Sequence, residues 1–426
     1  MKRAPVLLKL SNGVTLIYLE TENDPISACH LFLPGGVGEE PVDKSGVTTL
    51  RWSLLLKGTK HRNARQLAED IESLGASIGA GATHDYSEIS CHSVSEHFSK
   101  TLEIMGEVIF QPVFVPQEVE KEKIALIAAI RSKKESIFSV ASEELNKRMF
   151  PNHPYGRPSS GEEKSVEKFT VQDLLRAQKN ILTPSRAVLA AASNMPVAEV
   201  KPLFEKIFGA SVWAKTKEKK GRLAESAPNK TPQCVERIEH FEQAFLLTGV
   251  SAPSIQSKDY VALKLLNSIL GGGMSARLFQ QLREKEGLAY DVGSYYPTKL
   301  KGSSFVIYMG LQFARLEESK KRIQTLLDDI QKKKVSATEL AETKSYMKGT
   351  YILDHQTNSQ RAHYLGFWHM LGLTAAYDHE YIRKIDAVTA VQIQKAAKKY
   401  FGKPFITIEI HPQKSAGTPR PMVSVQ

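Results

Sequence analysis

The chain has 426 residues, of which 42% are hydrophobic and 24% charged, and its formal net charge is +11. This composition is typical of globular domains, and the length is sufficient for two or more of them. No apolar run reaches the 18 residues that a transmembrane helix needs. We therefore expect no membrane span. The basic residues are spread along the chain without the motifs of nucleic-acid-binding proteins, so we also expect no nucleic-acid partner.

The beginning of the chain predicts a strand. The first residues, MKRAPVLLKLSNG, contain an apolar run that is too short for a signal peptide.

The three cysteines, Cys29, Cys91 and Cys234, are widely spaced and form no CxxC pattern, which favours a reducing compartment. We therefore expect a cytoplasmic protein, or a periplasmic one if a leader has been removed.

A strand over residues 27–36 is followed by a predicted helix with an unusual composition. The helix lies in SGVTTLRWSLLLKGT, residues 45–59, and ends at Lys57-Gly58-Thr59. Before these three residues only Arg51 is ionisable, and apolar side chains lie on most sides of the helix. This pattern indicates a buried structural helix.

The next predicted helix reveals an internal repeat. Residues 64–75 and residues 276–287 both open with Ala-Arg and both reach a glycine at the same offset. The neighbouring elements recur in the same order, and a repeat of this period indicates two similar units. The recurring elements are strands at 27–36 and 243–252, strands at 76–92 and 288–310 (the second alternatively a hairpin), helices from Val115 and Val335, and strands at 186–193 and 404–412.

A polar, proline-containing stretch separates the two copies. We predict a linker at residues 213–232 between a domain of residues 1–212 and a domain of residues 233–426. Strands and helices, such as the helix predicted at 315–333, do not alternate strictly. The prediction is therefore an α+β fold with two similar repeats, each a mainly antiparallel sheet with helices on one face, facing across a cleft.

Several short motifs, in order, carry a resemblance that covers nearly the whole chain. The sequence is similar to the pitrilysin/insulinase (M16) metallopeptidase family, close to its short bacterial forms and to mitochondrial processing peptidase subunits. The resemblance implies the same two-repeat fold. It rests on Asn12-Gly13-Val14, Leu33-Pro34-Gly35-Gly36, Lys57-Gly58-Thr59, His153-Pro154-Tyr155-Gly156-Arg157-Pro158, Thr183-Pro184-Ser185 and the segments Leu270–Leu278 and Leu282–Tyr290.

The catalytic motif of that family is missing. Active members carry His-x-x-Glu-His before the Lys-Gly-Thr, in which two histidines hold zinc and the glutamate is the general base. The corresponding positions here are Thr49, Trp52 and Ser53, and Ala129 stands where a further glutamate ligand is expected. The resemblance therefore predicts no metal at this helix, no cofactor in this chain, and no independent peptidase activity.

A second feature of the family is retained. Active members supply an arginine and a tyrosine from the second half to the zinc site, and the matching residues here are Arg283 and Tyr290. A guanidinium and a phenol hydroxyl can donate hydrogen bonds to a substrate backbone and to a developing oxyanion. Without the resemblance, an ordinary ion pair and a core tyrosine would be the simpler interpretation.

Two other features have more than one interpretation. His84, His92 and His97 lie close in sequence, and His363 and His369 fall on different faces of a predicted helix, so we expect surface or partly buried histidines and not a metal site. The Gly- and Ala-rich strand ASIGAGATHDYSE either packs closely under a helix or offers an open edge to an extended peptide.

These observations leave three hypotheses for function. The first is a subunit without its own zinc that pairs with a partner carrying His-x-x-Glu-His and zinc, and contributes Arg283 and Tyr290 to a shared site for peptide hydrolysis. The second is a structural or scaffold protein of the same family. The third is a peptide-binding homologue that performs no chemistry.

Overall fold

The structure is a computed structural model that describes residues 4–22, 24–182, 184–209, 213, 223, 225–227 and 231–413. The predicted linker at residues 213–232 lies mostly outside the described residues, so its conformation remains a prediction. None of the described helices is both long and apolar enough to cross a lipid bilayer.

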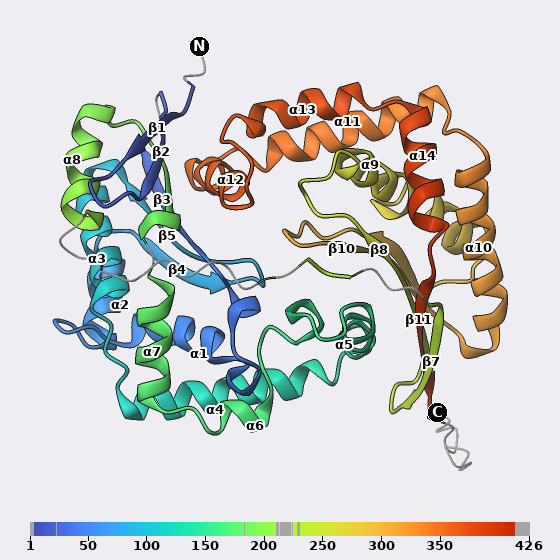
Figure 1. The fold of residues 1–426 in the computed structure, drawn as a ribbon, viewed down its shortest axis with the longest axis horizontal. Coiled ribbons are helices and arrows are strands. Elements are labelled where there is room, and N and C mark those ends of the chain that lie inside the picture. The colour runs from blue at the N-terminus through green and yellow to red at the C-terminus, as the bar shows by residue number, and fades with distance from the viewer. Residues whose placement is uncertain are drawn as a thin grey trace, which may run out of the picture.

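The first half of the chain folds as an α+β unit (Figure 1). Its strands are β1 (Val6–Lys9), β2 (Thr15–Glu20), β3 (Ile26–Pro34), β4 (Ser77–Ala82), β5 (Tyr86–Val94) and β6 (Val188–Ser193). Its helices are α1 (Val47–Leu54), α2 (Ala64–Ser73), α3 (Phe98–Phe110), α4 (Pro116–Lys133), α5 (Ile137–Met149), α6 (Glu163–Val166), α7 (Val171–Ile181) and α8 (Val197–Phe208).

The second half repeats this arrangement. Its strands are β7 (Gln233–Glu239), β8 (Ala244–Ala252), β9 (Asp291–Tyr295), β10 (Ser303–Leu311) and β11 (Phe405–Pro412). Its helices are α9 (Tyr260–Gly271), a π-helix (Phe279–Lys285), α10 (Leu316–Lys332), α11 (Ala337–Leu353), α12 (Asn358–Met370), α13 (Tyr377–Ala387) and α14 (Ala390–Phe401).

The sheet topology confirms that the two halves have the same fold. The strand orders are β1-β2-β6-β3-β5-β4 and β7-β11-β8-β10-β9, so the sheets match strand for strand once β1 is set aside. In each sheet the last strand of the half pairs in parallel with an early strand, as β6 does with β2 and β11 with β7. The other pairs are antiparallel, which confirms the predicted fold class.

The repeated glycines have the same structural role in both halves. Gly75 and Gly287 follow α2 and the π-helix with φ angles of +56° and +58°, in the left-handed region that glycine adopts without steric cost. Each glycine ends its helix and turns the chain into the edge strand of its sheet, β4 or β9. This explains the constant glycine offset in the sequence.

The side chains of β3 and β5 alternate between two different cores. Leu31, Leu33 and Ile89 point to one face and pack with the helices of their own half, including Trp52 of α1. Phe32 and Tyr86 point to the other face and belong to a core shared with the second half. The helices predicted for one face are therefore present, and the opposite face is covered by the other half of the chain.

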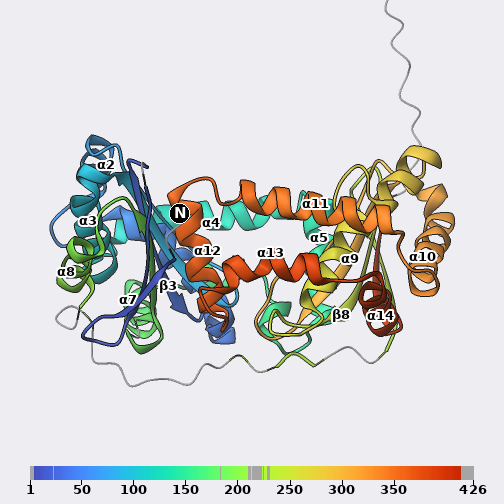
Figure 2. The ribbon, with the colours of Figure 1, turned by 90° about the horizontal axis from the view of Figure 1, so that it is seen from above.

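The two halves exchange helices across their junction (Figures 1 and 2). α12 packs on β3 and β6 of the first sheet, and α5 packs on β8 and β11 of the second. The close approach of α12 depends on Gly366, where an added Cβ would lie 2.2 Å from the Phe32 ring. Because each sheet is completed by a helix from the other half, the halves form one interlocked body.

One predicted element has a different shape. The strand expected over residues 76–92 is a hairpin of β4 and β5, because residues 83–85 form a turn in which the Thr83 N–H bonds to the Tyr86 carbonyl at 2.8 Å. The possible hairpin within residues 288–310 is confirmed as β9 and β10. The helix predicted at 315–333 is confirmed as α10.

Candidate functional site

Helix α1 is held in place at its N-terminus by a buried carboxylate. Glu40 accepts hydrogen bonds from the backbone N–H groups of Gly46 at 2.8 Å and Thr48 at 2.6 Å. A negative charge at this end complements the partial positive charge of the helix. Burial raises the pKa of Glu40, and the two backbone hydrogen bonds oppose that increase.

The middle of α1 is occupied by packing side chains. Trp52 is 4% exposed, and its indole N–H donates to Ser87 Oγ at 3.1 Å. The Arg51 guanidinium lies over the indole, with Cζ 3.6 Å from the ring centroid, and donates to Gln178 Oε1 at 2.6 Å. Burial lowers the pKa of Arg51 to about 9, an effect that Glu40 opposes. These contacts confirm that α1 is a buried packing element.

The positions that correspond to zinc ligands do not fit a zinc ion. The Thr49 hydroxyl donates to the Ser159 carbonyl at 2.8 Å, and the Ser53 hydroxyl donates to the Leu50 carbonyl at 2.9 Å. The Trp52 indole is only a donor, and exposed Ala129 of α4 has no ligand atom. Zinc in proteins is held by Cys, His or carboxylate ligands, so no zinc-dependent step is assigned to α1.

Arg283 is placed by an unusual backbone conformation. It lies within the π-helix, where the Glu286 N–H bonds to the Gln281 carbonyl at 3.1 Å. π-Helical turns are rare and occur frequently at functional sites. The side chain is exposed and contacts the Phe279 ring, with Cζ 4.9 Å from the ring centroid.

The neighbouring arginines are neutralised, whereas Arg283 is not. Arg277 forms a two-point ion pair with Glu339, at 2.7 and 2.6 Å, and Arg322 pairs with Glu286. Among the described residues, Arg283 has no ion-pair or hydrogen-bond partner. An unpaired guanidinium keeps all its donors available for a ligand.

Tyr290 lies where the chain enters the edge strand β9. Its backbone N–H donates to the Gly310 carbonyl of β10 at 2.8 Å, which fixes its position at the rim of the second sheet. The side chain is 54% exposed, so it is not the core tyrosine of the simpler interpretation. Its hydroxyl has no hydrogen-bond partner within the described chain segments.

The structure keeps the two predicted sets of residues apart. α1 packs with α4 and α7 in the first half, whereas the π-helix packs on β9 in the second half. In Figure 1, α1 lies at the left of the molecule and the yellow segment with the π-helix at the right. Within one chain, Arg283 and Tyr290 therefore do not act on residues 49–53.

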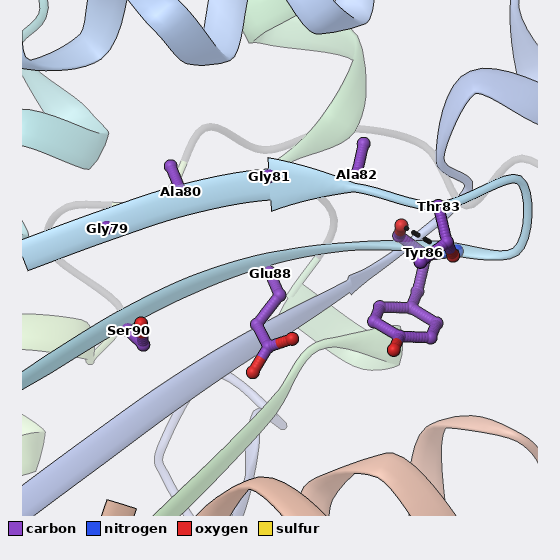
Figure 3. A pocket seen from close by; sticks show the side chains of 8 residues that line it. All are labelled: Gly79, Ala80, Gly81, Ala82, Thr83, Tyr86, Glu88 and Ser90. Carbon is purple, nitrogen blue, oxygen red and sulfur yellow. Dashed lines mark hydrogen bonds between the residues drawn. The ribbon is translucent and has the colours of Figure 1, made fainter. Parts of the chain in front are cut away.

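Beside β4 the first sheet has a groove, and β4 is the edge strand (Figure 3). Gly79 and Gly81 stand opposite Ser90 and Glu88 in the β4–β5 register, so β4 places no side chain beside either residue on this face of the sheet. The groove has a volume of about 360 Å³. A Cβ added at Gly81 would meet no heavy atom within 4 Å, so the space over this position of the edge strand is empty.

One cluster of chemical groups was not predicted. His30 of β3 and His363 of α12 both direct Nδ1 at Glu88 Oε1 of β5, at 2.5 and 2.8 Å. Burial alone would raise the pKa of Glu88, but the hydrogen bonds from His30 and His363 lower it to about 2. The sequence separations of 58 and 275 residues hide this cluster from any analysis of local motifs.

The histidines considered from the sequence have other surroundings. His84 lies in the turn between β4 and β5 and bonds to the Arg157 carbonyl at 3.1 Å. His92 is exposed and His97 is partly buried, as expected. The group of potential metal ligands found in the described part of the chain contains His363 but none of these three residues.

Two family models match consecutive parts of the sequence. Residues 15–163 match the model described as "Insulinase (Peptidase family M16)". Residues 168–347 match the model described as "Peptidase M16 inactive domain".

Relatives and solved structures resemble the chain along nearly its whole length. The uncharacterized zinc protease YmxG of Bacillus subtilis is 27% identical over 406 residues, which cover 94% of this chain and 97% of that protein. An uncharacterized zinc protease of Rickettsia felis is 26% identical and covers 86% of this chain and 87% of its own. A peptidase M16 inactive domain from Pseudomonas fluorescens has a TM-score of 0.89 at 22% identity, covering 96% of this chain and 98% of its own. A protease from Helicobacter pylori has a TM-score of 0.90 at 19% identity, covering 96% of this chain and 99% of its own.

Proposed function

Because the chain belongs to peptidase family M16, the insulinase family, we propose that it is a subunit without catalytic zinc that pairs with a zinc-bearing member of that family. The partner carries His-x-x-Glu-His and holds the zinc. The second half of this chain faces the first half of the partner and contributes Arg283 and Tyr290 to a shared active site for peptide hydrolysis.

The observation that carries this proposal is the contrast between the two sets of residues. The positions of the zinc motif have become packing and main-chain hydrogen-bonding groups, as Trp52 and Thr49 illustrate. Arg283 and Tyr290 remain exposed with their donor groups unused. Exposed, unpaired donors have no evident structural role in this chain alone.

The chemistry of the two residues suits a supporting role in hydrolysis. Attack of water on a peptide carbonyl places negative charge on the carbonyl oxygen, and fixed donors that meet this charge lower the barrier. The Arg283 guanidinium supplies a fork of N–H donors with a permanent charge, and the Tyr290 hydroxyl supplies one more donor.

The first test compares the purified chain with its mixture with a zinc-bearing family member from the same organism. The chain alone is expected to show no peptide cleavage that a chelator abolishes, because α1 offers no zinc ligands. The mixture is expected to cleave a fluorogenic peptide faster than the partner alone. Chelator-sensitive cleavage by the pure chain, lost on replacing Thr49 or Trp52, would contradict the proposal.

A second candidate function is peptide binding without hydrolysis, which the open edge of β4 favours. An extended peptide can add to a free sheet edge through main-chain hydrogen bonds, while side-chain pockets supply selectivity. The exposed edge and the groove over Gly79 and Gly81 provide both features.

Filling the groove is expected to separate this activity from the shared-site chemistry. We expect Gly81→Val to weaken binding of an extended peptide by the isolated chain by about tenfold or more, because the added side chain occupies the groove. Fluorescence anisotropy measures the affinity. The matched control is Gly349→Val on α11, which adds the same side chain in open space outside the groove. Equal affinities of the two variants would rule out binding at this edge.

A further inference from the structure

Three metal-ligating side chains converge at the junction of the two halves. His30 and Glu88 extend from β3 and β5 on the sheet face opposite α1, and His363 reaches them from α12. Their ligand atoms, two imidazole nitrogens and one carboxylate oxygen, all lie within 4.8 Å of one another. Each comes from a separate element, and one comes from the other half of the chain.

The donor set is one that zinc uses. Zinc binds imidazole nitrogen and carboxylate oxygen at roughly 2.0–2.2 Å, often with three protein ligands and a water. Neighbouring ligands of such a tetrahedral ion are about 3.3 Å apart. The His30–Glu88 and His363–Glu88 separations of 2.5 and 2.8 Å therefore need to widen only slightly to admit the ion.

The surroundings hold the three groups in position before any ion binds. Asn358 at the start of α12 donates to the Ile26 carbonyl of β3 at 2.6 Å, and Gly366 lies against Phe32 beyond His363. α12 is thus anchored to β3 on both sides of the histidine. Preorganised ligands of this kind favour tight binding because little order is lost.

A second interaction orients the most buried ligand. His30 Nε2 lies 3.0 Å from Ser359 Oγ, which leaves Nδ1 free to face Glu88. Metal-binding histidines typically use their other nitrogen in this way. The side chains of His363 and Glu88 are 32% and 20% exposed, and Glu88 lines the groove beside β4, which gives an ion and its water an entry path.

We propose that His30, Glu88 and His363 form a binding site for a divalent transition-metal ion, best matched by zinc, that joins the two halves of the chain. This site lies on the opposite face of the first sheet from α1 and is separate from the degenerate family motif. It revises the prediction from the sequence that no metal binds, since that prediction did not consider His30.

The test is a zinc titration of the full-length chain after chelator treatment and dialysis. Isothermal titration calorimetry is expected to show one zinc ion per chain, and zinc is expected to raise the melting temperature. His363→Gln and Glu88→Gln are expected to weaken binding by about 100-fold or more, and Ser359→Ala by about tenfold. The matched control His92→Gln, an exposed histidine on β5, is expected to bind zinc like the unaltered chain.

Two results would overturn the proposal. The first is that the unaltered chain binds zinc no more tightly than the His363→Gln variant does. The second is that a Glu88→Gln/His363→Gln double variant, shown to be folded by its circular dichroism spectrum, still binds zinc tightly. The ion would then lie elsewhere. Neither result bears on the shared peptidase site, since Arg283 and Tyr290 do not contact these residues.

Discussion

Replacing Arg283 with alanine is expected to lower the kcat/KM of the mixture with the zinc-bearing partner by about 100- to 1,000-fold. Loss of one donor to the developing oxyanion has an effect of this size in comparable sites. Steady-state cleavage of a fluorogenic peptide, at a fixed ratio of the two chains, gives the measurement. Tyr290→Phe removes only a hydroxyl and is expected to fall in the same range.

Further variants and a binding measurement distinguish an effect on the hydrolysis reaction from an effect on formation of the complex. Arg283→Lys keeps the charge but loses the planar fork of donors, so an intermediate activity is expected. The matched control is Arg65→Ala on α2, whose side chain is 87% exposed and, among the residues that the structure describes, pairs only with Glu69 across one helical turn. Binding of the variants to the partner, measured separately, shows that the complex still forms. Activity that is unchanged by Arg283→Ala and by Tyr290→Phe would refute the shared site.

Replacing Trp52 with alanine is expected to lower the free energy of unfolding by about 3–5 kcal/mol. The indole is 4% exposed, stacks under the Arg51 guanidinium and donates a hydrogen bond to Ser87, so its removal leaves a cavity and an unpaired arginine face. Urea unfolding followed by far-UV circular dichroism measures the loss. This result would show that α1 is retained for packing.

The matched control uses the neighbouring position of the lost zinc motif. Ser53 is exposed and its hydroxyl donates to the Leu50 carbonyl of its own helix, so Ser53→Ala is expected to change stability by less than about 0.5 kcal/mol. If Trp52→Ala were as mild as Ser53→Ala, the interpretation of α1 as a structural helix would be wrong.

The internal repeat was accessible from the sequence because it rests on local patterns. The glycine that ends each repeated helix, Gly75 or Gly287, needs a left-handed backbone that few other residues adopt. The alternation along β3 likewise follows from the geometry of a strand with two buried faces. The hairpin of β4 and β5 was missed because the turn at Thr83 lacks the usual Asn-Gly or Asp-Gly pair.

For the candidate site, too, some features can be identified from the sequence and others only from the structure. The absence of zinc ligands at positions 49, 52 and 53 is a matter of residue identity, and the sequence shows it directly. The π-helix around Arg283 and the pairing of Arg277 and Arg322 with carboxylates depend on backbone and side-chain geometry. The contrast that supports a role for Arg283 therefore required the structure.

The sequence by itself determined the two-repeat α+β design and the loss of the family's zinc ligands, since both follow from residue types at short and regular spacings. Only the tertiary structure decided that the halves exchange helices and that His30, Glu88 and His363 meet. Those contacts join residues as far apart in the sequence as Ile26 and Asn358, which are separated by 332 positions. Long-range packing of α12 on β3 creates them, and no local pattern in the chain encodes that packing.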